Sequence, residues 1–101
     1  MRVISQDGTL DFPYENSIVF IDTRAKEAAF VRMQAIGDNE TSITAKYSTK
    51  EKAKKAMEEL RYAYMCHSLV KMGQMSPDGI DEKLTIGLGG VFQFPAEEEL
   101  E

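Results

Sequence analysis

The chain has few residues of the kinds that form covalent or metal cross-links, since its 101 residues include one cysteine and one histidine. A lone cysteine, Cys66, excludes a disulfide within the chain and is typical of a reducing compartment. Zinc usually takes four ligands, so a site at Cys66 and His67 would need carboxylates such as Asp78, Asp81 or Glu82, or ligands from a second copy. We expect a packed or surface cysteine beside a histidine at a helix end and no cofactor, with zinc as the alternative.

Long apolar runs are also missing. No stretch approaches the roughly 20 apolar residues that a membrane-spanning helix needs. The opening segment, MRVISQDG, has neither the basic nor the apolar part of a signal peptide. A chain of this length suits a single domain. We therefore expect one soluble domain in the cytoplasm, without membrane contact.

Basic residues are too few for a typical nucleic-acid binder, because 12 lysines and arginines stand against 17 acids, a net charge of −5. Four of the acids lie in the final segment EEELE, which leaves 13 acids against 12 bases in residues 1–96. A body so close to neutral also argues against a general mimic of DNA phosphates. We divide the chain into one domain, residues 1–96, and a flexible acidic tail, residues 97–101.

The stretch from Ser48 to His67, STKEKAKKAMEELRYAYMCH, has the periodicity of one amphipathic helix. The residues on its packing face are Ala53, Ala56, Met57, Leu60, Ala63, Tyr64 and His67. The opposite face is charged. Ser48 followed by Glu51 fits a capping box at the start of the helix. The pattern leaves the C-terminal end of the helix undetermined, because it can continue through Leu69 and Val70 to a stop at Gly73.

Short segments on both sides of this helix predict strands, since they are rich in β-branched and aromatic residues. The candidates are Arg2–Ser5, Thr9–Phe12, Ser17–Asp22, Glu27–Ile36, Thr41–Tyr47, Leu84–Ile86 and Val91–Phe94. Asp7-Gly8 marks a tight turn between the first two. Segregation of strands and helix indicates an α+β fold, in which a small antiparallel sheet of about five or six short strands packs against one long helix.

The pattern within three segments predicts where their side chains point. The run from Ile18 to Ile21 is apolar on both faces, which suits a central strand with cover on each side. The segment Glu27–Ile36 alternates between apolar and polar residues, so its core face should consist of Ala29, Val31, Met33 and Ala35. A helix is the alternative there. In the segment Thr41–Tyr47, the alternation places Ile43, Ala45 and Tyr47 on one face of the strand and Thr44 and Lys46 on the other.

No combination of side chains has the spacing of a catalytic site. His67 lacks a recognisable motif partner, and the end of a helix, where a cation is favoured, is a sufficient reason for it. The glycine-rich residues 87–90 lack the lysine and hydroxyl residue of a phosphate-binding loop and indicate a turn or bulge. The lysines of the helix alternate with acids, as on a solvated face. We therefore expect that the protein is not an enzyme.

Three stretches carry a shared pattern. They are MRVISQDGTLDFPYE at 1–15, AKYSTKEKAKKAMEELRYAY at 45–64 and VFQFPAEEE at 91–99. Together they resemble a family of small accessory proteins from phages and prophages of Gram-positive bacteria. Its members open with a similar RVISQDG…PYE segment, carry a YS-(S/T)-x-E-K-A-x-x-A-M motif before a helix, and close with a phenylalanine–proline step and acids. Cys66 and His67 lie outside these stretches, so the resemblance implies no metal role for them.

The resemblance implies a cytoplasmic, phage-encoded protein that acts on the machinery of its bacterial host. Inhibitors of CRISPR–Cas immunity are a recurring class among small acidic phage proteins. The resemblance therefore implies an anti-CRISPR protein that binds the Cas9 effector and blocks loading of guide or target DNA, without binding nucleic acid itself. The alternative is a non-enzymatic accessory or structural module with no Cas target, for which a homodimer is one form.

A docking surface for a protein partner is expected on the charged face of the helix and on the acidic tail. The candidate residues are Lys50, Lys54, Glu58, Arg61, Glu97, Glu98 and Glu99. Charges on a contacting face steer association and fix register. Reversing them should therefore weaken binding without unfolding the protein.

Overall fold

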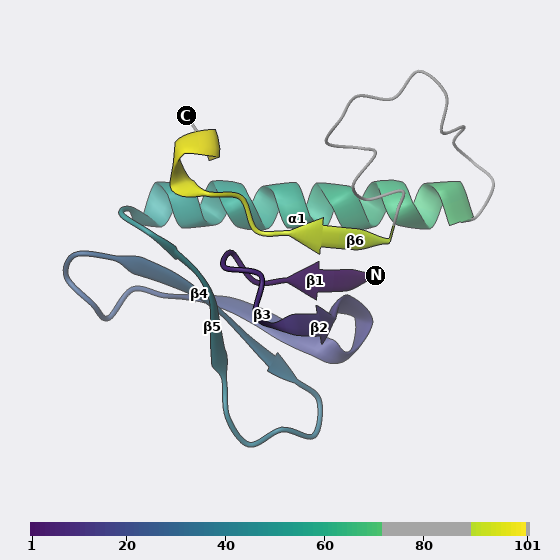
Figure 1. The fold of residues 1–101 in the computed structure, drawn as a ribbon, viewed down its shortest axis with the longest axis horizontal. Coiled ribbons are helices and arrows are strands. Elements are labelled where there is room, and N and C mark those ends of the chain that lie inside the picture. Colours follow the sequence, from purple (N-terminus) through teal and green to yellow (C-terminus); the bar gives the residue numbers. More distant parts are fainter. Residues whose placement is uncertain (72–89, 101) are drawn as a thin grey trace.

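The computed structural model describes residues 1–71 and 90–100, and Figure 1 shows their arrangement. The elements are β1 (Arg2–Ile4), β2 (Asp11–Pro13), the 3₁₀ helix η1 (Tyr14–Asn16), β3 (Ser17–Asp22), β4 (Ala29–Ala35), β5 (Ser42–Tyr47), α1 (Lys50–Lys71), β6 (Val91–Gln93) and the 3₁₀ helix η2 (Glu97–Leu100). The predicted α+β class is confirmed. The helix runs past His67 to Lys71, as the longer of the two predicted patterns allows.

The described strands form two sheets of three strands each, where the sequence predicts a single antiparallel sheet. The first sheet has the order β2-β1-β6 and the second has the order β3-β4-β5. Pairing is antiparallel except between β1 and β6, where Val3 opposes Phe92 in a parallel pair. Most of the chain, including α1, connects β1 to β6, and a connection of that length permits a parallel pair that a short hairpin cannot form.

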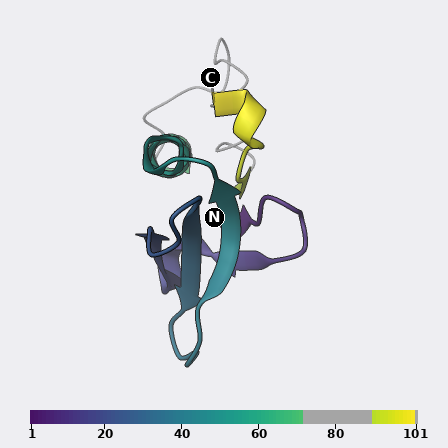
Figure 2. The same ribbon diagram turned by 90° about the vertical axis from the view of Figure 1, so that its left-hand side faces the viewer.

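α1 covers the core and packs on β3, β4 and β5. Figure 2 looks along this helix and shows it beside the strands, with η2 next to it. The buried residues of α1 include Ala53, Ala56, Leu60 and Ala63, as the periodicity predicts. The same core cluster holds Val31 and Met33 of β4, both 0% exposed. Tyr64 is half-buried and packs on Tyr14 with ring centroids 4.4 Å apart.

The N-terminus of α1 is capped by Thr49, whose Oγ1 accepts a hydrogen bond from the N–H of Lys52 at 3.2 Å. The predicted capping box of Ser48 and Glu51 is wrong. It requires the backbone N–H of Ser48, and that group donates to the Glu97 carboxylate of η2. The N–H of Ser48, which would donate to Glu51 in a capping box, therefore donates to the distant residue Glu97.

β3 lies at an edge of the second sheet, so the prediction of a central strand is wrong. Its inward residues Val19 and Ile21 pack against the core. Ile18 and Phe20 point the other way and are 58% and 37% exposed. An apolar run on both faces of a strand indicates two contacting surfaces, and the folded chain supplies one of them.

β4 takes the central position and has the core face that its alternation predicts. The buried residues of this strand are Ala29, Val31 and Met33, while Ala35 is half-buried at its end. On β5 a β-bulge interrupts the alternation, because Val31 pairs with Ala45 whereas Arg32 pairs with Ile43. Thr44 is the extra residue, and its Oγ1 donates to the Val31 carbonyl at 2.9 Å. The bulge turns Ile43 away from the side that Ala45 and Tyr47 occupy.

Side-chain and backbone hydrogen bonds join residues that follow β1 and β6 of the first sheet to β5 of the second sheet. Gln6, just after β1, donates its N–H to the Thr44 carbonyl at 2.6 Å and accepts the N–H of Lys46 at 3.0 Å. The buried Tyr47 donates its hydroxyl to the Pro95 carbonyl at 2.7 Å. These contacts occupy the outer edge of β5 and tie the segment after β6 to the second sheet.

The prediction of a flexible tail is wrong for Glu97–Leu100, which form η2. Leu100 is 3% exposed and belongs to the core cluster. Its carbonyl accepts a hydrogen bond from Lys55 Nζ at 2.7 Å. One leucine among the acids supplies the apolar surface whose burial docks this segment on α1.

The predicted turn between β1 and β2 is confirmed. Gly8 has a φ of +79°, a conformation that glycine adopts without a Cβ clash. Asp7 Oδ1 accepts hydrogen bonds from Ser5 Oγ at 2.6 Å, from the Thr9 N–H at 3.0 Å and from Thr9 Oγ1 at 2.7 Å. Ser5 Oγ in turn accepts the N–H of Leu10 at 3.0 Å.

We expect acid to remove the contribution of this turn to stability. Hydrogen bonds from Ser5 and Thr9 lower the pKa of Asp7 from 3.8 to about 2. A carboxyl group whose pKa is lower in the folded state stabilises the fold above pH 3.8, and this contribution is lost as the pH falls toward 2. Asp7→Asn should therefore unfold at a lower urea concentration than the wild type at neutral pH, and the difference should shrink below pH 3.8. A pH-independent difference, or the same one for the exposed Asp38→Asn, would contradict this.

Several predicted features lie outside the described residues. They are the loop at 74–83, the strand at 84–86, the helix stop at Gly73, most of the glycine-rich segment at 87–90, and the carboxylates Asp78, Asp81 and Glu82. Within residues 1–71 and 90–100, no helix combines the length and the hydropathy that a membrane span requires.

Candidate functional site

The second sheet turns one face to α1 and the other to solvent. We call the solvent side the outer face, and it consists of Ile18, Phe20, Phe30, Arg32, Gln34 and Ile43. Ile18, Phe20 and Ile43 are 58%, 37% and 45% exposed. Large apolar side chains that gather on one exposed face mark contact surfaces more often than scattered ones do.

Strand register places three of these residues in one row. Phe20 of β3 pairs with Arg32 of β4, and Arg32 pairs with Ile43 of β5. Directly opposed residues have Cβ atoms roughly 5 Å apart. The aliphatic part of Arg32 therefore lies between an aromatic and a branched side chain. Ile43 belongs to this row because of the bulge at Thr44.

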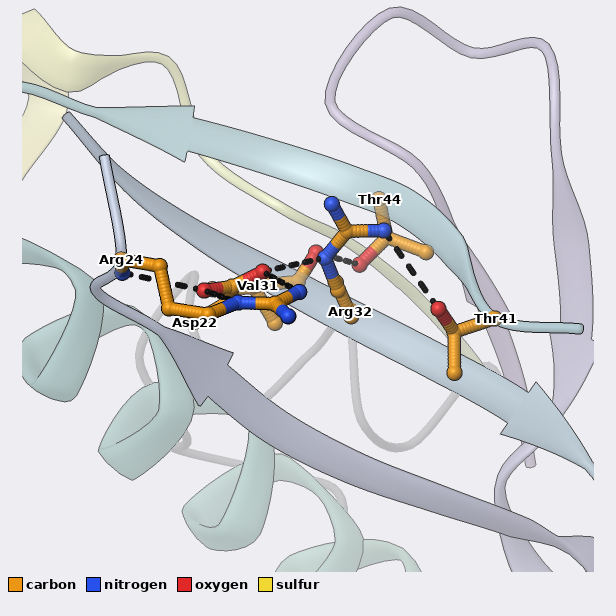
Figure 3. A network of polar contacts seen from close by, with 6 residues as sticks. All are labelled: Asp22, Arg24, Val31, Arg32, Thr41 and Thr44. Carbon is orange, nitrogen blue, oxygen red and sulfur yellow. Dashed lines mark hydrogen bonds and ion pairs between the residues drawn. The ribbon is translucent and has the colours of Figure 1, made fainter.

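A carboxylate at the end of β3 fixes the arginine of this row (Figure 3). Asp22 Oδ2 accepts a hydrogen bond from Arg32 Nε at 2.8 Å, and Arg32 Nη1 lies 3.4 Å from Thr41 Oγ1. Asp22 also accepts the backbone N–H of Arg24 at 3.1 Å, its Nε at 2.9 Å and its Nη2 at 2.8 Å. The Asp22 side chain is 7% exposed, so the two guanidinium groups enclose it.

The Asp22 carboxylate stays ionised under physiological conditions. Hydrogen bonds from the side chain and then the backbone of Arg24, with a smaller contribution from Arg32, hold the pKa of Asp22 far below its usual range. The Asp22 carboxylate and the two guanidinium groups together carry a net charge of +1. Of the two arginines, Arg24 is the more exposed, with 84% of its side chain in contact with solvent.

This arrangement is suited to contact with a protein. Arginine and aromatic residues are enriched at protein interfaces and among the residues that dominate their energetics. An arginine already ordered by a carboxylate loses less conformational entropy on binding than a free one. The outer face thus combines apolar contact area with hydrogen-bond donors held in place.

The helix residues predicted to dock a partner are exposed. Lys50, Lys54, Glu58 and Arg61 follow one another at helical spacing and share one side of α1. This side ends next to β3, where a groove of about 270 Å³ separates the helix from the strand. The groove is lined by Tyr14, Ser17, Val19, Met57, Leu60 and Arg61.

η2 holds the predicted tail acids on a different side of α1. Glu97 accepts the N–H of Ser48 and lies 3.8 Å from Lys52 Nζ. Hydrogen bonding from the side chain and backbone of Ser48 lowers the pKa of Glu97. The exposed Glu98 follows it. Lys52 and Lys54 are separated by two residues, or about 200° around the helix axis, so the structure does not unite the helix candidates and the tail candidates in one surface.

Cys66 and His67 do not form a metal centre with other described residues. Cys66 is 1% exposed, whereas His67 is half-buried. His67 Cε1 lies 3.5 Å from the position that a Cβ atom on Gly90 would take. Among residues 1–71 and 90–100, no three histidine, cysteine, aspartate or glutamate side chains cluster as metal ligands would.

Sequence patterns miss the outer face. The apolar run of β3 predicts burial for Ile18 and Phe20, although the same run also fits an edge strand with a second contact surface. Ile43 carries no local signal, because its direction depends on the bulge at Thr44. The partnership of Asp22 with Arg32 is equally invisible, since these residues meet only through strand pairing.

Comparisons of the chain with family models, with curated proteins and with solved structures give no match.

Proposed function

We propose that this protein acts without catalysis, by docking its outer face on another protein. The observation that carries the proposal is the row of Phe20, Arg32 and Ile43, in which an ordered arginine lies between two exposed apolar side chains. Interfaces typically draw most of their binding energy from a few such residues, surrounded by contacts that exclude water. Ile18 extends the apolar area along β3.

The partner that we propose is the Cas9 effector of the bacterial host, which makes the protein an anti-CRISPR that acts in the host cytoplasm. Support for this partner comes from the resemblance of residues 1–15, 45–64 and 91–99 to phage accessory proteins. Docking would block the loading of guide or target DNA by occupying a protein surface. The near balance of 13 acids and 12 bases in residues 1–96 favours this mode over phosphate mimicry.

Phe20→Glu should abolish inhibition of Cas9. The change removes the aromatic contact area at one end of the row and puts there a carboxylate that loses its hydration on docking, and loss of such a residue typically costs 2 kcal/mol or more, roughly a 30-fold weaker affinity. Phe20 points away from the core, so the variant should keep the circular dichroism spectrum of the wild type. Co-elution with purified Cas9 measures binding, and cleavage of target DNA measures inhibition.

Val91→Glu is the matched control. Val91 is 44% exposed on β6 of the first sheet, so the same kind of change there should leave inhibition intact. Should Phe20→Glu still inhibit while Lys54→Glu combined with Glu58→Lys does not, the docking surface is the charged face of α1. Should the wild type neither bind Cas9 nor slow cleavage, the proposed partner is wrong for the effector tested.

A further inference from the structure

Within residues 1–71 and 90–100, the edges that no further strand covers differ between the two sheets. β2 and β6 are three residues long, and Pro13 and Pro95 lie at or just beyond their ends. Short edge strands and prolines prevent pairing with another chain. The edge of β5 is occupied by Gln6, which bonds to Thr44 and Lys46, and the bulge adds a further irregularity. These three edges are therefore protected.

β3 has none of these protections among the described residues. It is six residues long, contains no proline or lysine, and pairs with β4 without a register shift. The Ile36 N–H donates to the Asn16 carbonyl, and these residues are opposed one step beyond the pairing of Ser17 with Ala35. Hydrogen-bonded pairs alternate along antiparallel strands, so Val19 and Ile21 direct their N–H and C=O groups to the open side.

We propose that this edge pairs with the β3 edge of a second copy of the chain, antiparallel about a two-fold axis at Val19. In this register the two Val19 residues exchange both backbone hydrogen bonds. Ile18 of each copy opposes Phe20 of the other on the outer face, in non-hydrogen-bonded positions where side chains approach most closely. The Ile21 N–H meets the Ser17 carbonyl of the second copy.

Charge also favours a second copy as the occupant. Antiparallel pairing brings the end of one β3 beside the start of the other. The end carries Arg24, which is ion-paired with Asp22 and whose side chain is 84% exposed, and the start follows Glu15, which is ion-paired with the N-terminal amine of Met1 and whose side chain is 42% exposed. An exposed basic and an exposed acidic side chain therefore come near each other at both ends of the pair.

The dimer closes on itself. An isologous interface uses the same surface of both copies, so one contact consumes both open edges and no third chain can add. The second sheets join into one sheet of six strands, and the two outer faces become continuous. The inner side of the same edge borders the groove that Tyr14, Met57 and Arg61 line, which gives each copy further surface beside the axis. This inference does not depend on the proposed partner.

Light scattering after size exclusion tests the assembly with the full chain alone. The wild type should have twice the chain mass of 11.4 kDa at high concentration and approach one chain mass on dilution. Val19→Pro removes an N–H that β4 does not use, and Ile18→Lys places a charge opposite Phe20 of the second copy. Each should raise the dissociation constant of the dimer at least about tenfold. Ile43→Lys, on the outer face but on the far strand of the sheet, should remain a dimer.

Hydrogen exchange locates the contact independently of folding defects in a variant. The Val19 amide of the wild type should exchange slowly at high concentration and fast on dilution, whereas the amide of Val31, within the sheet, stays slow. A single-chain mass at millimolar concentration overturns the proposal. So does a dimer whose mass is unaffected by both Val19→Pro and Ile18→Lys, or a Val19 amide that exchanges fast within the dimer.

Discussion

Replacing Leu60 by alanine should lower the free energy of unfolding by about 3 kcal/mol. Leu60 is 1% exposed in the middle of α1, and it belongs to the same core cluster as Val31 and Met33 of β4. Removal of the branched end leaves a cavity that two elements border. The helix cannot close it easily, because Ala56 and Ala63 already bring this face of α1 close to the sheet. Urea unfolding followed by circular dichroism measures the difference.

Two variants separate a packing effect from a change in helix propensity. Met65→Ala lies on the same helix but is 48% exposed, and should change stability by less than about 0.5 kcal/mol. Leu60→Met keeps the volume and should cost less than about 1.5 kcal/mol. A loss for Leu60→Ala no larger than that for Met65→Ala would mean that this face of α1 is not the core.

Leu100→Ala should lower the free energy of unfolding by about 2 kcal/mol, although the residue is the last but one in the chain. Leu100 is 3% exposed within the core cluster, and its carbonyl is bonded to Lys55. The expected loss is smaller than that for Leu60→Ala, because η2 is a single short turn and relaxes more readily around a deletion than the middle of α1 does. The same urea titration serves, with the exposed Glu98→Ala as control.

The outcome distinguishes a docked segment from a solvated tail. If residues 97–100 form η2 as described, the loss of Leu100 should also free the Ser48 N–H from Glu97, and hydrogen exchange at Ser48 should accelerate. A loss below about 0.5 kcal/mol, equal to that of Glu98→Ala, would instead support the solvated tail that the charge pattern predicts. Any role of the tail acids in partner binding is then better tested by Glu98→Lys than by truncation, which removes Leu100 as well.

Local periodicity predicted burial correctly for elements that have one apolar face. The 3.6-residue repeat of Ala53, Ala56, Leu60 and Ala63 predicts the buried face of α1, because a helix with one apolar side has one way to hide it. The alternation of β4 predicts its core residues for the same reason. Local motifs were unreliable where a distant residue competes. Ser48 bonds to Glu97 instead of completing a box with Glu51, and a charged segment docks through Leu100.

The candidate surface was out of reach of sequence reasoning for a geometric reason. Ile43 belongs to the outer face because one extra residue, Thr44, shifts the register of β5 against Arg32. Phe20 belongs to it because β3 is an edge strand, a position that depends on strand order and not on the composition of the strand. Arg32 is ordered by Asp22, which comes within hydrogen-bond distance only through the pairing of β3 with β4.

The scarcity of cross-linking residues, the near-neutral body, the helix face and the α+β class were determined by the sequence itself, since each depends on composition or on contacts within a few residues. Strand order, the division into two sheets, the bulge, the docking of η2 and the open edge of β3 were decided by tertiary structure. Each of these depends on which distant segments pair, and the free energies that select among pairings arise from packing and hydrogen bonds that form only when the whole chain is assembled.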